Sequence, residues 1–187
     1  MSLKLHTIIA STRPSRVGPA VAEWFHNAAK AHGGFDASLV DLASFNLPVF
    51  DEPEHPRTGH YHHAHTKAWS ASVKSADAFV FVTPEYNYGP PPSLINALTY
   101  LSAEWAYKPA AFVSYAFVSG GTRAVQATKP WLTTLKMMPI PEGVAIPNFP
   151  AFFDADKKFV PNELVAAGVK PTLDELARWA TALKTLR

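Results

Sequence analysis

Two short apolar runs, each followed by a polar loop, constrain the fold of this chain more than any other feature. Residues 78–82 read Ala-Phe-Val-Phe-Val, and a run this short and apolar is typical of a strand buried on both faces. It leads into Thr-Pro-Glu-Tyr-Asn-Tyr-Gly at 83–89, and the run at 5–10 leads into Ser-Thr-Arg-Pro-Ser-Arg at 11–16. Open α/β sheets bind ligands at the carboxyl ends of such strands, so these loops are the first candidates for a binding site.

Strand and helix patterns alternate along the rest of the chain. Apolar runs predict strands at residues 5–10, 35–40, 78–82, 110–114 and 143–146. Apolar residues at helical spacing predict helices over residues 18–32, 66–75, 92–101, 122–136 and 173–183. Thr172 and Glu175 form a capping-box pattern at the start of the last helix. The connection at 43–65 is long and rich in proline and histidine, which is typical of a functional loop or an interface.

This alternation predicts a parallel sheet with helices on both faces. For five strands, the most economical arrangement is a flavodoxin-like, doubly wound α/β fold with the strand order 2-1-3-4-5. The first and third strands then flank the point where the strand order reverses, and both polar loops leave these strands. A chain of 187 residues fits a single domain over residues 1–187.

The composition argues against several classes of function. The 17 Lys and Arg residues are scattered among 15 Asp and Glu residues, so we expect no nucleic-acid partner. The absence of cysteine excludes disulfides, thiolate metal sites and a thiol nucleophile. No apolar run approaches ~18 residues and no signal-peptide core follows Met1, so we expect a cytoplasmic protein without a membrane partner. Charged residues make up only 17%, which fits either a homo-oligomer or a well-filled core.

The loop after the first strand has the groups that bind a phosphate without a metal. Three hydroxyl side chains lie within 11–15, and Arg13 and Arg16 add positive charge and bidentate reach. Backbone N–H groups at the start of the following helix would face the same anion. The loop matches neither G-x-G-x-x-G nor a Walker motif, and an ordinary helix start is the alternative. The candidate phosphate-binding residues are Ser11, Arg13, Ser15, Arg16 and Val17.

The loop after the third strand suits a flat ring such as an isoalloxazine. Pro84 fixes the direction of this loop, while Glu85, Tyr86, Asn87 and Tyr88 supply backbone N–H groups and aromatic surface. The glycine at 89 permits close approach or a positive φ. The loop at 114–121 is expected beside the ring, and its paired glycines fit either close approach or a plain helix start. A tyrosine-rich packing turn is the alternative for 84–89.

At this point the motifs resemble a known family. The chain is similar to the NADPH-dependent FMN reductases, a flavodoxin-like group that includes quinone, azo-dye and chromate reductases. The resemblance lies in Ser-x-Arg-x-x-Arg at 11–16, Thr-Pro-Glu-Tyr-Asn-Tyr at 83–88, Asn-Ala-Leu at 96–98, Ser-Tyr at 114–115 and Ser-Gly-Gly-Thr-Arg-Ala at 119–124. The chain departs from the family pattern at Ala10, Ile95, Thr99 and Ala116. These departures concern binding of the substrate or nicotinamide more than binding of FMN.

The resemblance implies a non-covalently bound FMN that NADPH or NADH reduces by two electrons. Hydride would pass through FMN to a small-molecule electron acceptor: a quinone, an azo dye, a metal oxyanion or free flavin. It also implies a homodimer or homotetramer with the flavin near a subunit interface. Carried over, it assigns the phosphate to Ser11, Arg13 and Arg16, the ring to 84–87, and the other side of the ring to Ser114 and Tyr115. No side chain is required as an acid or base, so no catalytic residue is predicted.

Two further interpretations stay open. A non-enzymatic flavin-binding redox sensor or partner-binding module would carry the same motifs without turnover. The histidines at 55, 60, 62, 63 and 65 could ligate a metal, shape access to the flavin, or belong to a surface or interface loop. The segment has no carboxylate-plus-histidine spacing on a helix, so the surface loop is the simplest interpretation and no metal is predicted.

Overall fold

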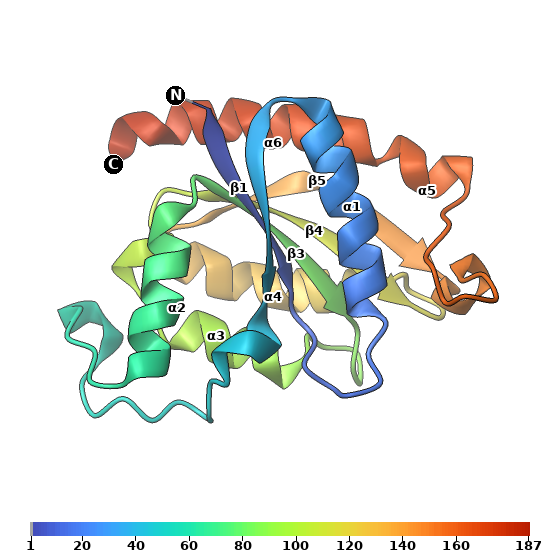
Figure 1. Ribbon diagram of the computed structural model, residues 1–187. Helices are drawn as coiled ribbons and strands as arrows, with labels where there is room; N and C mark the ends of the chain where they lie inside the picture. Colours follow the sequence, from blue (N-terminus) through green and yellow to red (C-terminus); the bar gives the residue numbers. More distant parts are fainter. Residues whose placement is uncertain (1) are drawn as a thin grey trace.

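The computed structural model describes residues 2–187 and contains a five-stranded sheet in the order β2-β1-β3-β4-β5 (Figure 1). Each pair of neighbouring strands is parallel. The strands are β1 (Leu3–Ile9), β2 (Phe35–Asp41), β3 (Ala78–Pro84), β4 (Pro109–Ala116) and β5 (Met138–Pro147). The predicted fold class, a flavodoxin-like doubly wound parallel sheet with the order 2-1-3-4-5, is confirmed.

Helices cover both faces of this sheet. They are α1 (Gly18–His32), α2 (Ala64–Ser75), α3 (Pro92–Thr99), α4 (Thr122–Thr134), α5 (Glu163–Ala167) and α6 (Val169–Leu183). α1 and α6 pack on one face, while α2, α3 and α4 lie on the other (Figure 1). Within residues 2–187, no helix is both long enough and apolar enough to cross a membrane.

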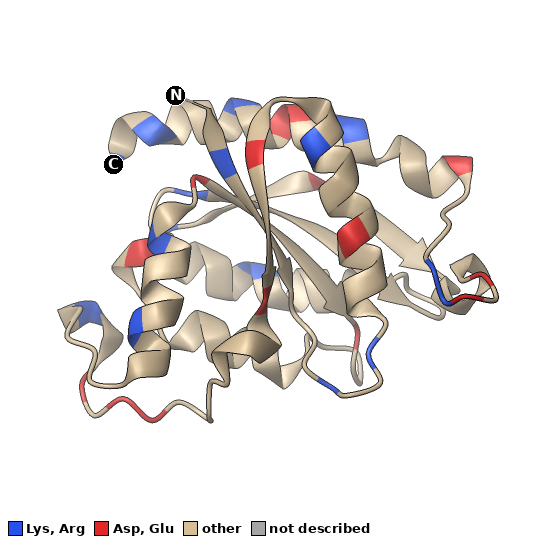
Figure 2. Ribbon diagram, viewed as in Figure 1, with Lys and Arg blue, Asp and Glu red and all other residues tan. Residues whose placement is uncertain are grey.

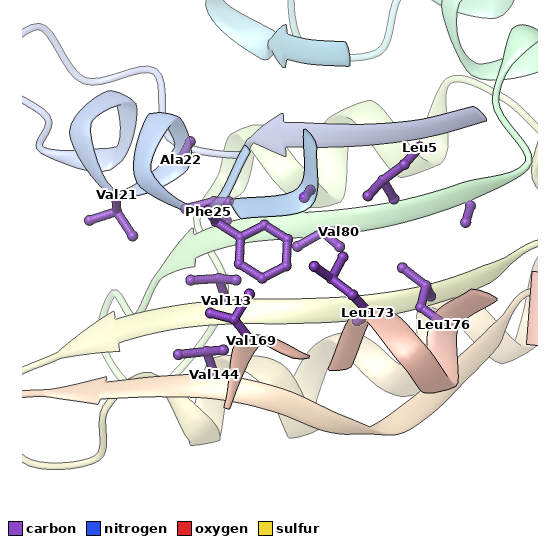
Figure 3. Close-up of a cluster of buried hydrophobic side chains, with 14 of the residues drawn as sticks. Leu5, Val21, Ala22, Phe25, Val80, Val113, Val144, Val169, Leu173 and Leu176 are labelled. Carbon is purple, nitrogen blue, oxygen red and sulfur yellow. The ribbon is translucent and has the colours of Figure 1, made fainter. Parts of the chain in front are cut away.

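The central strand β3 is buried on both faces, which explains its unbroken apolar sequence. Val80 joins Phe25 of α1 and Leu173 of α6 in the core under those two helices (Figure 3). Phe79 points to the opposite face, where its ring packs edge-on against Trp105 at 5.0 Å between centroids. Each large side chain buried in this way stabilises the fold by about 1.5–3 kcal/mol, so the position of β3 is strongly determined.

Strand β5 forms one edge of the sheet and is longer than predicted. It begins at Met138 rather than at residue 143, and prolines stand at positions 139, 141 and 147. Prolines argue against a central strand, but an edge strand tolerates them because its outer N–H groups need no partner. Charged side chains lie mostly on helices and loops, and few are on the strands (Figure 2).

The last helix begins earlier than predicted. Thr172 lies inside α6, where its Oγ1 donates a hydrogen bond of 2.7 Å to the carbonyl of Gly168 one turn earlier. The short helix α5 precedes α6 and is capped by Asn162, whose side chain accepts a 2.9 Å bond from the N–H of Val165. The capping-box prediction was therefore wrong, because a threonine can also bond backward within a helix.

A buried histidine in β1 makes the fold sensitive to acid. His6 is 6% exposed, and its Nδ1 has no hydrogen-bond partner among residues 2–187. Burial, together with the positive charges of Lys108 and Lys4, lowers the pKa of His6 from 6.5 to about 4. Between these two values the unfolded chain binds a proton that the native chain does not, so the free energy of unfolding decreases as the pH falls.

We therefore expect His6→Leu to reduce the pH dependence of stability. Between about pH 7 and pH 5, the variant should lose roughly 1–2 kcal/mol less unfolding free energy than the wild-type protein. Urea denaturation at both pH values measures this difference. Equal losses in the two proteins would show that folding does not lower the pKa of His6.

Candidate functional site

The strands β1, β3 and β4 end at the same edge of the sheet (Figure 1). The loops that leave them border one cavity. Its volume is about 230 Å³. The cavity is lined by Arg13, Arg16, Val17, Pro84, Glu85, Tyr86, Tyr115, Ala116, Phe117 and Phe149. Seven of the twelve predicted site residues are in this lining, and they come from all three loops.

The start of α1 provides unpaired donors beside this cavity. Val17 occupies the N-cap position and has no side chain that can accept from the first helical N–H groups. These N–H groups and the helix dipole favour an anion at this end of the helix. Arg13 and Ser15 are exposed on the same loop, so positive charge and a hydroxyl stand close to the free donors.

Ser11 and Tyr115 are packed against the start of α1. Ser11 is fully buried, and the hydroxyl of Tyr115 lies 3.5 Å from its Oγ. A Cβ added to Gly18 would come within 2.5 Å of the Ser11 Oγ, so only glycine allows this close packing. Burial raises the pKa of Tyr115 to about 12, which keeps its hydroxyl neutral at physiological pH.

Arg16 is held by a residue that the sequence did not indicate. Its Nη1 and Nη2 donate to Oδ1 and Oδ2 of Asp41 at 2.8 Å and 2.5 Å, and Nη1 also donates to the carbonyl of Ser11. Asp41 ends β2, the neighbour of β1 in the sheet. The predicted strand order, which places the end of strand 2 beside the loop after strand 1, was the signal that could have identified Asp41.

The loop after β3 closes in a tight turn. The backbone groups of Tyr86 and Gly89 exchange two hydrogen bonds of 2.8 Å and 2.9 Å. The two residues between them, Asn87 and Tyr88, have φ angles of 49° and 66°, as in the type I′ turn. The positive φ expected at Gly89 therefore falls on Asn87 and Tyr88 instead. Their own N–H groups take no part in the turn's two bonds and remain available to a ligand.

The side chain of Glu85 attaches this turn to the start of α4. Its carboxylate accepts hydrogen bonds from Ser119 Oγ at 2.6 Å and from the N–H and Nη1 of Arg123 at 3.1 Å and 3.2 Å. Burial alone would raise the pKa of Glu85, but these bonds and the Arg123 charge bring it below its usual value. The Arg123 guanidinium also lies 4.2 Å from the centre of the Tyr88 ring. Glu85 thus contributes a charge that stays ionised and has its partners within the protein.

The paired glycines after β4 allow the loop to approach that strand closely. Gly121 has a φ of 86°, and a Cβ there would lie 2.7 Å from the Cβ of Ser114. Ser114 is 2% exposed, and its Oγ donates to the carbonyl of Gly120 at 2.8 Å. The Ser114 hydroxyl therefore points into the protein interior. The two glycines allow the loop both to pack against β4 and to begin α4.

Two phenylalanines that sequence reasoning missed complete the cavity. Phe149 follows β5, and its ring lies 5.4 Å from Tyr115 and 5.3 Å from Phe117 between centroids. The N–H of Asn148 donates to the carbonyl of Phe117 at 2.6 Å, which joins the two segments. Phe117 is 65% exposed, so most of its ring faces solvent at the cavity mouth. For Phe149 the only sequence signal was the richness of the segment after β5 in proline and phenylalanine, whereas Phe117 lies in the 114–121 loop that the sequence placed beside the ring.

Five of the predicted site residues are not in the cavity lining. They are Ser11, Ser15, Asn87, Tyr88 and Ser114. Ser11 and Ser114 face the interior, whereas Ser15, Asn87 and Tyr88 are exposed on loops that border the cavity.

The histidine-rich loop pairs with its own carboxylates. His65 Nε2 lies 3.1 Å from Asp51, and His62 Nε2 lies 3.0 Å from Glu54. Asp51 also accepts a 2.8 Å hydrogen bond from Tyr100. Among residues 2–187 there is no group of three or more His, Cys, Asp or Glu side chains placed to hold a metal. None of these loop residues lines the cavity.

A parallel sheet in this order, with a cavity where the strand order reverses between β1 and β3, is typical of flavodoxin-like proteins. Residues 3–151 match the family described as NADPH-dependent FMN reductase. The chain therefore belongs to the NADPH-dependent FMN reductase family, as the sequence motifs predicted, and it is a flavoenzyme of the oxidoreductase class that uses FMN and NAD(P)H.

Individual relatives agree with this membership. The chain is 43% identical over 125 residues to an NAD(P)H-dependent FMN reductase of Schizosaccharomyces pombe, a match that covers 66% of this chain and 62% of the relative. It is 36% identical over 150 residues to an NAD(P)H-dependent FMN reductase of a Nectria species, covering 77% and 75%. The structure of FerB, a flavoenzyme NAD(P)H:(acceptor) oxidoreductase of Paracoccus denitrificans, superimposes with a TM-score of 0.75 at 19% identity, covering 96% and 98%. At that identity, FerB supports the fold alone.

The contacts of Glu85 lead to a prediction about stability. The side chain is only 6% exposed, so Glu85→Gln places an amide among donors that require an acceptor. We expect the variant to lose about 1.5–3 kcal/mol of unfolding free energy, the range for a hydrogen-bonded charge. Glu23→Gln, at an exposed position of α1, is the matched control and should change stability little. Similar urea midpoints for the two variants would argue against the attachment of the turn to α4.

Proposed function

We propose that this chain holds FMN in the cavity at the carboxyl edge of β1, β3 and β4 and passes electrons from NAD(P)H to a planar organic acceptor. One observation carries the proposal. A cationic loop with uncapped helix donors and two aromatic loops converge on the same cavity. A phosphate and a flat ring are the two ends of a flavin mononucleotide. The N–H and arginine donors therefore fit its phosphate, and the aromatic lining fits its ring.

The phosphate would be bound by Arg13, by Arg16 and by the free N–H groups at the start of α1. The ring would lie against 84–88, where the backbone N–H groups of the turn can donate to its polar edge, with Tyr115 on the other side. When bound, FMN supplies the hydride chemistry. The chain orients the ring and keeps the charge around it constant, because Tyr115 stays neutral and Glu85 stays ionised. Neither Tyr115 nor Glu85 exchanges a proton near neutral pH.

The lining favours a planar aromatic acceptor, such as a quinone or an azo dye, over a metal oxyanion. Phe117 and Phe149 provide apolar ring surface at the mouth, which suits stacking against a flat molecule. An oxyanion needs free cationic donors. Arg16 is already paired with Asp41, and Arg13 would be occupied by the cofactor phosphate, so the lining has no further cation for such a substrate.

We further propose that residues 1–187 act as one domain and assemble into a homodimer or homotetramer. Val49 and Trp131 are apolar and exposed by 88% and 43%. A hollow of about 290 Å³ is lined by Phe50, by Leu98 of α3 and by Trp131 of α4. Apolar surface of this kind is typical of interfaces. Light scattering during gel filtration measures the number of chains in the assembly. The cytoplasmic location is a separate prediction, which rests on the sequence.

The proposal is tested directly by anaerobic titration. We expect purified protein loaded with FMN to be bleached by NADPH or NADH and reoxidised by a quinone. Arg13→Ala should weaken FMN binding by about 1.5–3 kcal/mol through loss of a charge-assisted contact, measured by quenching of flavin fluorescence. Lys30→Ala, at the far end of α1, is the control. Unchanged FMN affinity in the Arg13 variant would show that Arg13 does not contact the phosphate.

The acceptor preference has its own test. Phe117→Ala should raise the KM for an aromatic quinone roughly fivefold, because aromatic stacking of this kind contributes about 1 kcal/mol. Turnover with ferricyanide, which has no ring to stack, should not change. Val118→Ala is the matched control, since Val118 is 85% exposed beside Phe117 and carries no aromatic ring. An equal loss with both acceptors would show that Phe117 does not select planar substrates.

A further inference from the structure

The contact between Arg16 and Asp41 joins the candidate phosphate loop to the neighbouring strand β2. The Arg16 side chain is 15% exposed and that of Asp41 is 32% exposed, so the pair is largely shielded from water. Asp41 Oδ1 also accepts a 3.0 Å hydrogen bond from the N–H of Ala43. The carboxylate is therefore fixed from both sides, by the guanidinium and by the backbone that follows β2.

The donors of Arg16 are only partly used by this contact. A guanidinium has five N–H groups in a rigid plane. The recorded bonds to Asp41 and to the carbonyl of Ser11 use three of them, and Arg16 also lines the cavity. Two donors thus remain on a guanidinium whose orientation is already determined.

We propose that Asp41 is a positioning residue for the FMN phosphate, acting through Arg16. This inference rests on the proposed function, because it concerns the same cavity and the same cofactor. Asp41 holds the flexible Arg16 side chain in one orientation before the phosphate arrives, so binding does not have to order it. Asp41 itself does not touch the ligand.

Two opposing effects determine what happens when the Asp41 charge is removed. A carboxylate near a phosphate repels it, so neutralising Asp41 would by itself strengthen binding. Both carboxylate oxygens, however, face the guanidinium at hydrogen-bond distance, so the negative charge is compensated locally. Loss of the fixed guanidinium orientation should therefore dominate, and the net effect should be weaker phosphate binding.

Comparison of FMN with riboflavin isolates the phosphate, because riboflavin has the same ring without it. In Asp41→Asn we expect the Kd for FMN to rise about tenfold, the size of a charge-assisted contact, while the Kd for riboflavin stays within about twofold. Asp36→Asn is the matched control, since Asp36 is exposed at the other end of β2. Fluorescence quenching on the same preparations gives all the constants.

A second variant tests the contact from its other side. Arg16→Lys keeps the positive charge but cannot form a two-point contact with a carboxylate, so it should show the same FMN-selective loss even if Asp41→Asn folds poorly. Because both changes act through one contact, the double variant should lose no more FMN affinity than the larger single loss. Additive losses, a parallel loss of riboflavin, or tighter FMN binding in Asp41→Asn would overturn the role of Asp41. Failure of the wild-type protein to bind either flavin would instead refute the proposed function.

Discussion

Burial of β3 between two layers of helices is the constraint on which the rest of the structure depends. With apolar side chains directed to both faces, β3 can occupy only the middle of the sheet. Its neighbours β1 and β4 run parallel to it, so all three strands end at the same edge. The two hydrophobic cores thereby bring three loops together, although those loops contribute little to the cores themselves.

Polar contacts then fix the loops relative to one another. Glu85 reaches across 38 positions of sequence to Arg123, and Arg16 reaches across 25 positions to Asp41. In both cases a charged residue of a loop is bound to an element that the sheet already holds in place. These contacts restrain the loops that border the cavity, and a site restrained before its ligand arrives has a lower entropy cost of binding.

The parts of this structure that could be predicted are those that depend on local pattern. The run at 78–82 identified β3, and the alternation of elements gave the strand order. The partners of Arg16 and Glu85 could not be predicted, because a charged residue does not indicate which distant group it will meet. Phe149 lines the cavity but could not be predicted, because it belongs to a segment whose sequence lacks a regular pattern. Thr172 shows the limit of a local motif, since a threonine followed by an acid also fits the inside of a helix.

The prolines of β5 have a consequence for how copies of this molecule can meet. An exposed edge strand normally offers a row of backbone donors to which another chain can add a strand. Where prolines stand at 139, 141 and 147, those donors are missing, and intermolecular extension of the sheet is disfavoured. At the β5 edge, contact between copies is therefore restricted to side chains and loops, which disfavours the growth of fibrous aggregates from this side of the sheet.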